Sequence, residues 1–363
     1  MEAQMGPTIP ILWTILSLYN LYVIMCTQRI ALCQSCGKGL YCSRNESRIT
    51  RIITFPQKEG LVKRASQSVE RLDSIRIGFI GAGKVGFSLG RLLSDKGYPI
   101  SGYVSRTLES AREAARFTES RCFETREELV AASDAIFVTV PDRAITEVYL
   151  ELLNCDISGK QICHCSGSLS AEEAFPKIHE AGAYGYSIHP LFPVNDRYTS
   201  YRELPRAVFC IEGDQEHLGD WKARLESTGA TVQEISGKSK KLYHAACCVS
   251  SNLMCALVQQ SIDMLRACGF EEDAARSAIA PLMSANLEHI IEVGPIQALT
   301  GPIERNDAET VSAHLESLVE DSERELYRIA SLKLVDVARA RHPQDDYSKI
   351  YETLGESVKG DKQ

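Results

Sequence analysis

The sequence predicts an α/β chain in which a doubly wound, mainly parallel sheet precedes an all-helical C-terminal domain. Short apolar segments typical of buried strands alternate with amphipathic stretches between residues 75 and 236. A glycine triplet with the spacing G-x-G-x-x-G directly follows the first of these segments. After residue 236 the strand-like segments end, and apolar residues recur at helical spacing. Together these observations favour an α/β domain followed by a helical one.

The composition is that of an ordinary globular protein large enough for two domains. The chain has 363 residues, of which 44% are hydrophobic and 24% are charged. Its net charge of −8 at pH 7 argues against nucleic acid as a main partner. Many of its 13 cysteines lie in apolar runs, where a reduced thiol behaves as a small hydrophobic side chain. We therefore expect a reducing compartment, the cytoplasm, and no disulfide framework.

Residues 1–73 are predicted to form an N-terminal extension that ends in a linker. Residues 8–26 are apolar and about as long as a bilayer crossing, and an anchor here would leave the later domains in the cytoplasm. The alternatives are a signal peptide, which the lack of leading positive charge disfavours, and an upstream extension foreign to the native protein. Cys33, Cys36 and Cys42 lack the fourth ligand of a structural zinc site, so no metal is expected.

A dinucleotide-binding turn is predicted directly after the first strand. Residues 75–80, IRIGFI, have little polar content, as expected of a parallel strand covered on both faces. Gly81 permits the sharp turn, and Gly83 lets a pyrophosphate approach the backbone without a Cβ in the way. Gly86 allows the next helix to pack against the strand. This arrangement is typical of a Rossmann domain, which we place at residues 74–236.

The helix after this turn is predicted to begin near Lys84 and Val85. Its amphipathic pattern continues through Leu89, Leu92 and Leu93. The free amides and the dipole at a helix N-terminus favour a bound diphosphate. We therefore place Lys84 and Val85 beside the three glycines in the cofactor site.

The residues after the second strand predict which dinucleotide binds. Residues 98–104 form this strand, and Ser105, Arg106 and Thr107 follow it where the ribose should lie. NAD-specific folds place an acidic residue here, whereas the first acid in this chain, Glu109, falls inside the next helix. A hydroxyl and an arginine offer charge-assisted hydrogen bonds to a 2′-phosphate, so we expect NADP(H). The alternative is a solvent-exposed arginine at a helix start.

Two further strands complete the predicted cofactor edge. Residues 134–141 form a buried strand that ends at Val140 and Pro141, which would flank the nicotinamide ribose or the adenine side of the cleft. Residues 160–165 form the next strand, after which Ser166 could either cap a helix or contact the nicotinamide.

A histidine near the end of the α/β pattern has a constrained direction. His189 directly precedes Pro190, and an X-Pro pair is extended and rigid. Strands at residues 207–211 and 231–235, separated by a helix, then complete the α/β pattern.

Residues 237–357 are predicted to form a helical domain for substrate binding and dimerisation. Apolar residues recur at helical spacing from Lys238 to Cys268, a length that implies burial against a second protomer or inside a helical domain. On one face of this helix the polar residues His244, Cys248 and Asn252 recur every four positions, so they should point in one direction.

Two more helices are predicted at residues 271–293 and 307–341. The loop between them contains two prolines and two glycines, and such rigid irregular backbone often lines a site. Asp307 should cap the helix that follows this loop.

Residues 75 to about 355 resemble a widespread family of oxidoreductases that join a Rossmann domain to a helical C-terminal domain of unknown function, similar to that of 6-phosphogluconate dehydrogenase. The resemblance rests on the motifs GFIGAGKVG, SIHPLFP, YHAACCVSSN and ALTGPIERND. More distantly, the chain is similar to ketopantoate reductases, prephenate dehydrogenases and hydroxyisobutyrate dehydrogenases, whose helical domains often dimerise. Ketopantoate reductases carry a lysine and two asparagines at four-residue steps on one helical face. Here the matching stripe is His244, Cys248 and Asn252, so that lysine is absent at this position.

The motifs and the resemblance imply an NADP-dependent reductase or dehydrogenase that acts on a small carbonyl or imine. His244 is the first candidate for the general acid, because imidazole titrates near neutrality, and His189 is the rival. Asn252 would hold the substrate oxygen, and Arg305 could bind a substrate carboxylate. The candidate substrate-binding residues are Ser251, Thr300 and Arg305.

Two other functions stay open at this point. The first is a non-catalytic NADP(H) sensor, whose helical domain would report the state of the cofactor to a partner. The second is a membrane-tethered scaffold, which would require residues 8–26 to be an anchor. In each case we expect a homodimer formed through the helical domain.

Overall fold

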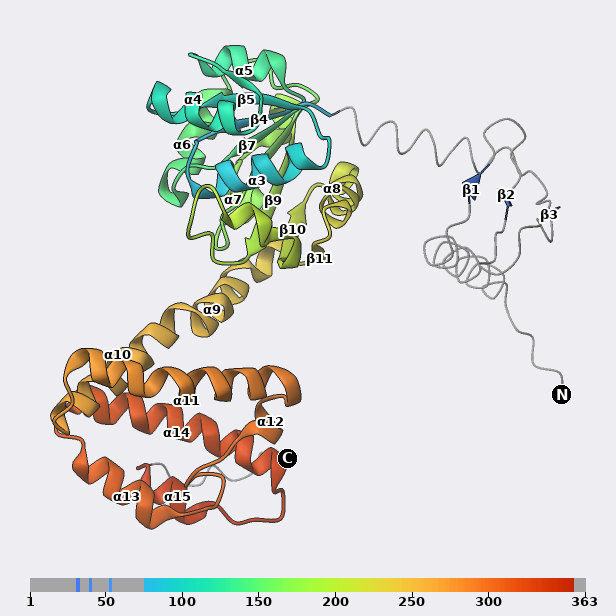
Figure 1. The fold of residues 1–363 in the computed structure, drawn as a ribbon. Helices are drawn as coiled ribbons and strands as arrows, with labels where there is room; N and C mark the ends of the chain where they lie inside the picture. The colour runs from blue at the N-terminus through green and yellow to red at the C-terminus, as the bar shows by residue number, and fades with distance from the viewer. Residues whose placement is uncertain (1–30, 33–38, 41–51, 54–74, 356–363) are drawn as a thin grey trace.

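The computed structural model describes residues 75–355 and the short antiparallel strands β1 (Ala31–Leu32), β2 (Gly39–Leu40) and β3 (Ile52–Ile53). The apolar segment 8–26 lies outside the described residues, as do the three cysteines between residues 33 and 42. From residue 75 the chain forms a sheet surrounded by helices and then a helical region, which helix α9 (Lys240–Ser250) joins to the sheet (Figure 1).

An eight-stranded sheet occupies the first region. Its strands are β4 (Ile77–Ile80), β5 (Ile100–Val104), β6 (Arg121–Cys122), β7 (Ala135–Val138), β8 (Gln161–His164), β9 (Tyr184–Leu191), β10 (Val208–Gly213) and β11 (Thr231–Glu234). They lie in the order β11-β10-β9-β8-β7-β4-β5-β6. All neighbouring strands are parallel except β9 and β10. The predicted mainly parallel sheet is therefore confirmed.

Helices cover both faces of this sheet, as the doubly wound class requires (Figure 1). The helices are α3 (Lys84–Asp95), α4 (Leu108–Phe117), α5 (Arg126–Ala132), α6 (Asp142–Leu152), α7 (Ala171–Ala174) and α8 (Gln215–Ser227). The apolar side chains of α3, α4 and α8 share one core with Phe79, whereas those of α5, α6 and α7 share the other with Ile80. Successive side chains of a strand point to opposite faces, so a continuous apolar strand contributes to both cores.

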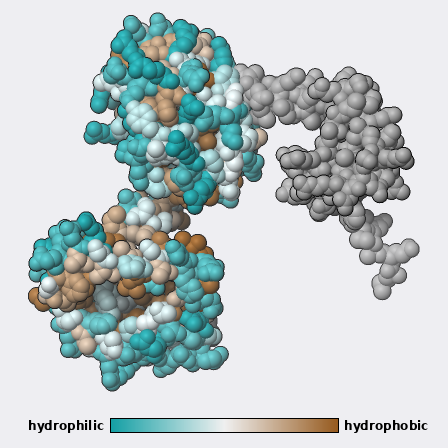
Figure 2. Space-filling view, in the orientation of Figure 1, coloured by the Kyte–Doolittle hydropathy of each residue, from teal (hydrophilic) through white to brown (hydrophobic). Residues whose placement is uncertain are grey.

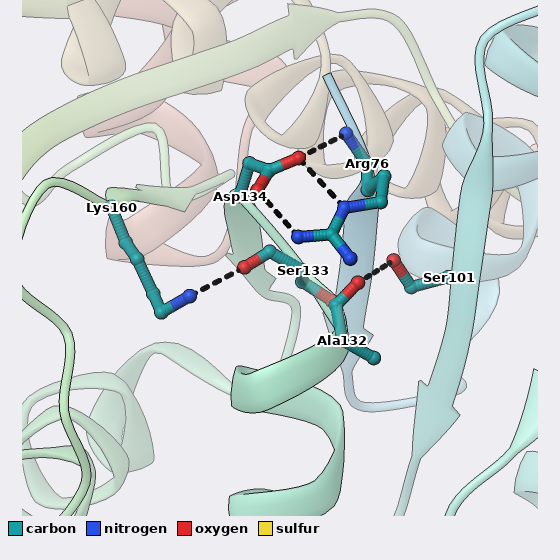
Figure 3. Close-up of polar contacts among 6 residues, drawn as sticks. All are labelled: Arg76, Ser101, Ala132, Ser133, Asp134 and Lys160. Atoms are coloured by element: carbon teal, nitrogen blue, oxygen red, sulfur yellow. Dashed lines mark hydrogen bonds and ion pairs between the residues drawn. The ribbon is translucent and has the colours of Figure 1, made fainter. Parts of the chain in front are cut away.

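Polar contacts hold the amino-terminal edge of the sheet, where the strands begin (Figure 3). The Arg76 guanidinium donates to both oxygens of Asp134, from Nε at 3.0 Å and from Nη2 at 2.8 Å. These hydrogen bonds keep the pKa of the Asp134 carboxyl below its ordinary value. Lys160 Nζ donates to the carbonyl of Ser133 at 2.7 Å and so ties the start of β8 to that of β7. The opposite, carboxyl-terminal edge carries the loops in which the predicted cofactor-binding residues lie.

The helical region begins with α9 and continues to residue 353. Its other helices are α10 (Asn252–Ala267), α11 (Glu272–Val293), α12 (Pro295–Ala298), α13 (Ala308–Ser317), α14 (Asp321–Arg341) and α15 (Ser348–Thr353). Helices α13, α14 and α15 enclose a small core that includes Val311, Val335 and Ile350. Asp307 caps α13 as predicted, because its Oδ1 accepts a hydrogen bond from the amide of Thr310 at 3.0 Å.

Two predictions of continuous helices are wrong. The stretch from Lys238 to Cys268 is interrupted at Ser251, where φ is −130° and ψ is −70°. The Ser250 and Ser251 hydroxyls donate back to the carbonyl of Cys247 at 3.2 and 2.8 Å, and such bonds bend helices.

The stretch 307–341 likewise forms two helices. It is interrupted after Ser317, because Leu318 adopts extended backbone and is buried. Carbonyls at the end of a helix have no partner inside that helix. The Arg324 guanidinium supplies donors for two of them, because it donates to the carbonyls of Leu315 and Leu318.

Candidate functional site

The glycine turn between β4 and α3 has the shape that the sequence predicts, and two of its glycines are required by packing. Gly81 has a φ of +103°, and a Cβ there would lie 2.7 Å from the carbonyl oxygen of Thr139. A Cβ at Gly86 would lie 2.3 Å from Thr139 Oγ1. At Gly83, by contrast, the nearest atom to an added Cβ is 3.9 Å away. Packing does not require a glycine at position 83, so the open space there fits the approach of a ligand.

The N-terminus of α3 presents hydrogen-bond donors on this open side. Lys84 is the first residue of α3, and Gly83 precedes it as the N-cap without a side-chain cap. The first hydrogen bond of the helix runs from the amide of Phe87 to the carbonyl of Gly83 at 3.0 Å. The amides before Phe87 therefore have no partner inside the helix, and Gly83 and Lys84 are exposed. This arrangement can bind a diphosphate.

The residues predicted to read the ribose lie at the end of the neighbouring strand β5. Ser105 is half-buried, Arg106 and Thr107 are exposed, and Thr107 is the N-cap of α4. Within residues 75–355, no carboxylate pairs with the Arg106 guanidinium. A guanidinium without an acidic partner at this edge is free to bind a phosphate.

Val140 and Pro141 follow β7, and Ser166 follows β8, at the same edge of the sheet. Pro141 is the N-cap of α6, which begins at Asp142. Ser166 Oγ donates to Asp142 Oδ2 at 2.6 Å and accepts from the amide of Leu169 at 3.1 Å. The hydroxyl thus holds the loop after β8. The alternative role of Ser166 as a helix cap is wrong, because the cap of α7 is Ser170.

His189 and His244, the two candidate proton donors, come together at this edge although they lie far apart in the sequence. His189 belongs to β9 and His244 to α9. A Cβ added to Gly167 would lie 2.6 Å from His244 Cδ2 and 3.0 Å from His189 Nε2. Both imidazoles therefore pack against Gly167, so the sheet and the first helix of the helical region meet at this glycine.

The partners of the two imidazoles differ. His189 Nδ1 lies 2.7 Å from the hydroxyl of Tyr243, so its Nε2 faces Gly167. Burial, together with the positive charge of Lys240, lowers the pKa of His189 to about 4. His189 is consequently uncharged at pH 7. His244 Nδ1 faces the sulfur of Cys248 at 3.9 Å, one turn along α9.

Lys240 is a residue of this site that the sequence reasoning missed. It is the first residue of α9, lies four positions before His244 and is only 1% exposed. Its Nζ donates to the carbonyl of Ser166 at 2.8 Å and to Ser187 Oγ at 2.7 Å. Burial lowers the pKa of this amine. The four-residue spacing to His244 was the signal that could have found it, since it extends the polar stripe by one helical turn.

Asn252 and Ser251 lie where α9 ends and α10 begins. The interruption at Ser251 removes the premise that His244, Cys248 and Asn252 share one straight helix. Both residues are exposed, and Ser251 Oγ donates to Asn252 Oδ1 at 3.1 Å. Their roles stay predictions.

Thr300 and Arg305 lie in the loop between α12 and α13, inside the helical region (Figure 1). Both are exposed, and in the described part of the chain the Arg305 side chain forms no ion pair, although its charge acts on the nearby Asp307 carboxyl. The structure does not bring them against Gly167. Their role in binding substrate also stays a prediction.

Two protein families match separate parts of the chain. Residues 76–165 match the family described as NADP oxidoreductase, coenzyme F420-dependent. Residues 207–334 match DUF2520, a domain of unknown function. No curated protein matches the sequence. The predicted combination of a Rossmann domain with a helical domain of unknown function is confirmed.

Several solved structures share this architecture over nearly their whole length. Protein TM1727 from Thermotoga maritima is 28% identical, with a TM-score of 0.60 over 73% of this chain and 99% of its own. BF3122 from Bacteroides fragilis, named as an NADP oxidoreductase, is 23% identical, with a TM-score of 0.56 over 73% of this chain and 99% of its own. A Streptomyces aurantiacus imine reductase is 17% identical, with a TM-score of 0.51 over 77% of this chain and 99% of its own. The last two similarities show the fold alone.

Proposed function

We propose that this chain, which combines an F420/NADP oxidoreductase Rossmann domain with a C-terminal DUF2520 domain, is an NADPH-dependent reductase of a small carbonyl or imine. The observation that carries the proposal is the meeting of His189 and His244 over Gly167. This position lies at the same edge of the sheet as the glycine turn. A proton donor and a cofactor-binding turn at one edge are what the reduction of a C=O or C=N bond requires.

The residues of the turn fit a dinucleotide, because Gly83 opens onto free space beside unpartnered helix amides. The amides of residues 83–85 would hold the pyrophosphate, and Arg106 would hold the 2′-phosphate. When bound, NADPH supplies the hydride. The protein then needs to orient the acceptor, exclude water and supply one proton.

We assign the proton to His244. Its Cδ2, the ring atom bonded to Nε2, lies against Gly167, and its Nδ1 faces Cys248. His189 is the weaker candidate, because burial keeps it uncharged at pH 7 and a neutral imidazole is a poor acid. The hydrogen bond between the Tyr243 hydroxyl and His189 Nδ1 would instead fix the imidazole ring, so that His189 Nε2 orients the acceptor. Lys240 fixes the start of α9, which carries His244, against the sheet.

We further propose that the protein acts as a homodimer formed through the helical region. Leu242 and Ile291 are 77% and 75% exposed, and apolar residues gather where the two regions join (Figure 2). Within the described residues, the stretch Gly237–Ala267 is long and apolar enough by length and composition to cross a membrane. Its start is nevertheless tied to the sheet by Lys240. We therefore attribute its apolar surface to contact with a second copy.

We propose the cytoplasm as the location of the described domains. All nine cysteines in the described part of the chain are free thiols. Such a content of reduced thiols suits a reducing compartment.

The proposed function is tested by following NADPH absorbance with a panel of keto acids, ketones and cyclic imines. A matched variant is Gly83→Val, because its added side chain enters open space and should block the pyrophosphate without disturbing the fold. We expect turnover by the parent protein and none by this variant, at an unchanged unfolding midpoint. Tight NADPH binding without turnover on every compound would instead favour the sensor function.

A further inference from the structure

The connection between β9 and β10 is much longer than an antiparallel pair requires. Leu191 and Val208 lie opposite each other at the end of the two strands. A hairpin at this point needs about two to five residues. The chain instead uses residues 192–207, with the short helical turns η2 (Ser200–Arg202) and η3 (Leu204–Arg206). We call residues 192–207 the strap.

The strap reaches away from its own strands and contacts α3 and α4. The Tyr198 ring packs edge-on against Phe87 of α3, at 5.1 Å between centroids, and against Phe117 of α4, at 5.7 Å. Asp196 Oδ1 accepts hydrogen bonds from the amides of Tyr198 and Thr199 at 2.9 and 2.8 Å. These contacts give the strap a defined conformation beside the glycine turn.

Arg197 of the strap joins three elements of the dinucleotide domain. Its Nη1 donates to Glu113 Oε2 of α4 at 2.8 Å, and its guanidinium carbon lies 4.6 Å from the centre of the Phe87 ring. Its Nη2 donates to the carbonyl oxygen of Ala82 at 3.1 Å. Ala82 is the residue between the first two glycines of the turn.

The contact with Ala82 constrains the donor that faces the ligand. The carbonyl of Ala82 and the amide of Gly83 belong to one planar peptide unit and point in opposite directions. Glycines flank Ala82 on both sides, so this peptide plane would otherwise rotate easily. The bond from Arg197 holds the carbonyl toward the strap and thereby directs the Gly83 amide to the other side.

The other carbonyls of the turn are held from within the sheet. The amide of Thr139 donates to Ile80 at 2.8 Å, and Thr139 Oγ1 donates to Gly81 at 2.8 Å. The carbonyl of Gly83 accepts the first bond of α3. The carbonyl of Ala82 is thus held by the strap, whereas the carbonyls of Ile80 and Gly81 are held by Thr139 and that of Gly83 by α3.

We propose that Arg197 is a positioning residue of the dinucleotide site, which fixes the Ala82–Gly83 peptide so that the Gly83 amide faces the pyrophosphate. The inference rests on the proposed NADPH site and adds a determinant of affinity that lies outside the glycine motif. Arg197 acts through the backbone of the turn and recognises no part of the adenosine.

The test uses two ligands that share the 2′-phosphate. NADPH carries the pyrophosphate, whereas adenosine 2′-monophosphate carries the phosphate expected at Arg106 and no pyrophosphate. Dissociation constants for both are measured by titration calorimetry on the full chain and on Arg197→Met. We expect NADPH to bind about tenfold more weakly to the variant, as for the loss of one charged hydrogen bond, and adenosine 2′-monophosphate to bind unchanged.

Two further variants separate positioning from damage to the fold. Arg197→Lys keeps the positive charge but can hold only one acceptor well, so it should recover part of the NADPH affinity. Arg202→Met is the matched control, because Arg202 lies in the same strap, and among the described residues its guanidinium forms a hydrogen bond and a ring contact only with Tyr201. It should bind both ligands as the parent does.

Unchanged NADPH binding in Arg197→Met would overturn the inference. Equal weakening of both ligands would overturn it too, since that result means that the strap merely holds the domain together. A parent protein that fails to bind NADPH would overturn the proposed function together with the inference. If the parent binds NADPH and Arg197→Met binds it equally well, only the inference is overturned and the proposed function stands.

Discussion

His189 of the sheet and His244 of α9, the first helix of the helical region, pack against the same residue, Gly167, although 55 positions separate them in the chain. Each would be within 3.0 Å of a Cβ placed on that glycine. The two candidate donors are therefore alternatives at a single position. The burial of His189, which leaves it uncharged near neutrality, favours His244 as the acid.

The first prediction concerns cofactor choice. The full chain should bind NADPH at least about tenfold more tightly than NADH, because a charged hydrogen bond contributes about 1.5–3 kcal/mol. Arg106→Ala should remove most of this difference, since no carboxylate competes for this guanidinium in the described part of the chain. Calorimetric titration with both cofactors measures the ratio. Equal binding of NADH by the parent protein would contradict the assignment of residues 105–107 to the 2′-phosphate of NADPH.

The second prediction concerns pH and stability. His164 is fully buried, and burial lowers its pKa to about 3, whereas in the unfolded chain it is about 6.5. The unfolded state therefore binds the extra proton below pH 6.5, and the free energy of unfolding falls by about 1.4 kcal/mol per pH unit from there. His189, with a pKa of about 4, contributes in the same direction.

Urea unfolding at pH 7 and pH 5 measures this loss. Asparagine at position 164 keeps an acceptor for the amide of Ser166, so His164→Asn should retain the fold and show a loss smaller by about 2 kcal/mol. The exposed His179→Asn change should leave the loss as in the parent. An identical loss in His164→Asn would contradict the account of the buried histidine.

The third prediction concerns assembly. Light scattering at micromolar concentration should give twice the mass of one chain, because α9, α10 and α11 expose more apolar surface than a monomer stabilises in water. Val249→Glu combined with Ile291→Glu should weaken the dimer by at least about 3 kcal/mol, since it would bury two charges in an apolar contact. Val319→Glu is the control, because Val319 is even more exposed than Val249 and Ile291 but lies between α13 and α14. A monomeric parent protein would refute this assembly.

Six of the eight strands of the sheet could be predicted from the sequence, because most of them are short, apolar segments. The strands β6, which consists of Arg121 and Cys122 alone, and β9, which carries His189, were not predicted. The glycine turn was predictable from its local spacing, and the structure adds that Gly81 and Gly86 pack against Thr139, which directly follows the neighbouring strand β7. The helical region was predicted less well. Its two interruptions depend on serine hydroxyls at 250 and 251 and on Arg324 of the next helix, and periodicity does not reveal such contacts.

The site was predicted only in part, because its members meet through tertiary contacts. The candidates His189 and His244 follow from residue type, but their meeting over Gly167 depends on where α9 leaves the sheet. Lys240 was overlooked because a lysine at a helix start is usually solvated, whereas this one is buried between Ser166 and Ser187. Arg197 carries no local motif, and its role depends on a strap that crosses to a helix more than 100 residues earlier.

The most direct test of the central claim is the turnover of His244→Gln with NADPH and an active carbonyl or imine substrate. Glutamine keeps much of the volume and one hydrogen-bond donor but has no titratable proton, so NADPH affinity should barely change. If His244 is the general acid, the rate should fall by about 10²- to 10⁴-fold. His189→Gln should lose less. Full turnover in His244→Gln together with an inactive His189→Gln would contradict this assignment and identify His189 as the proton donor.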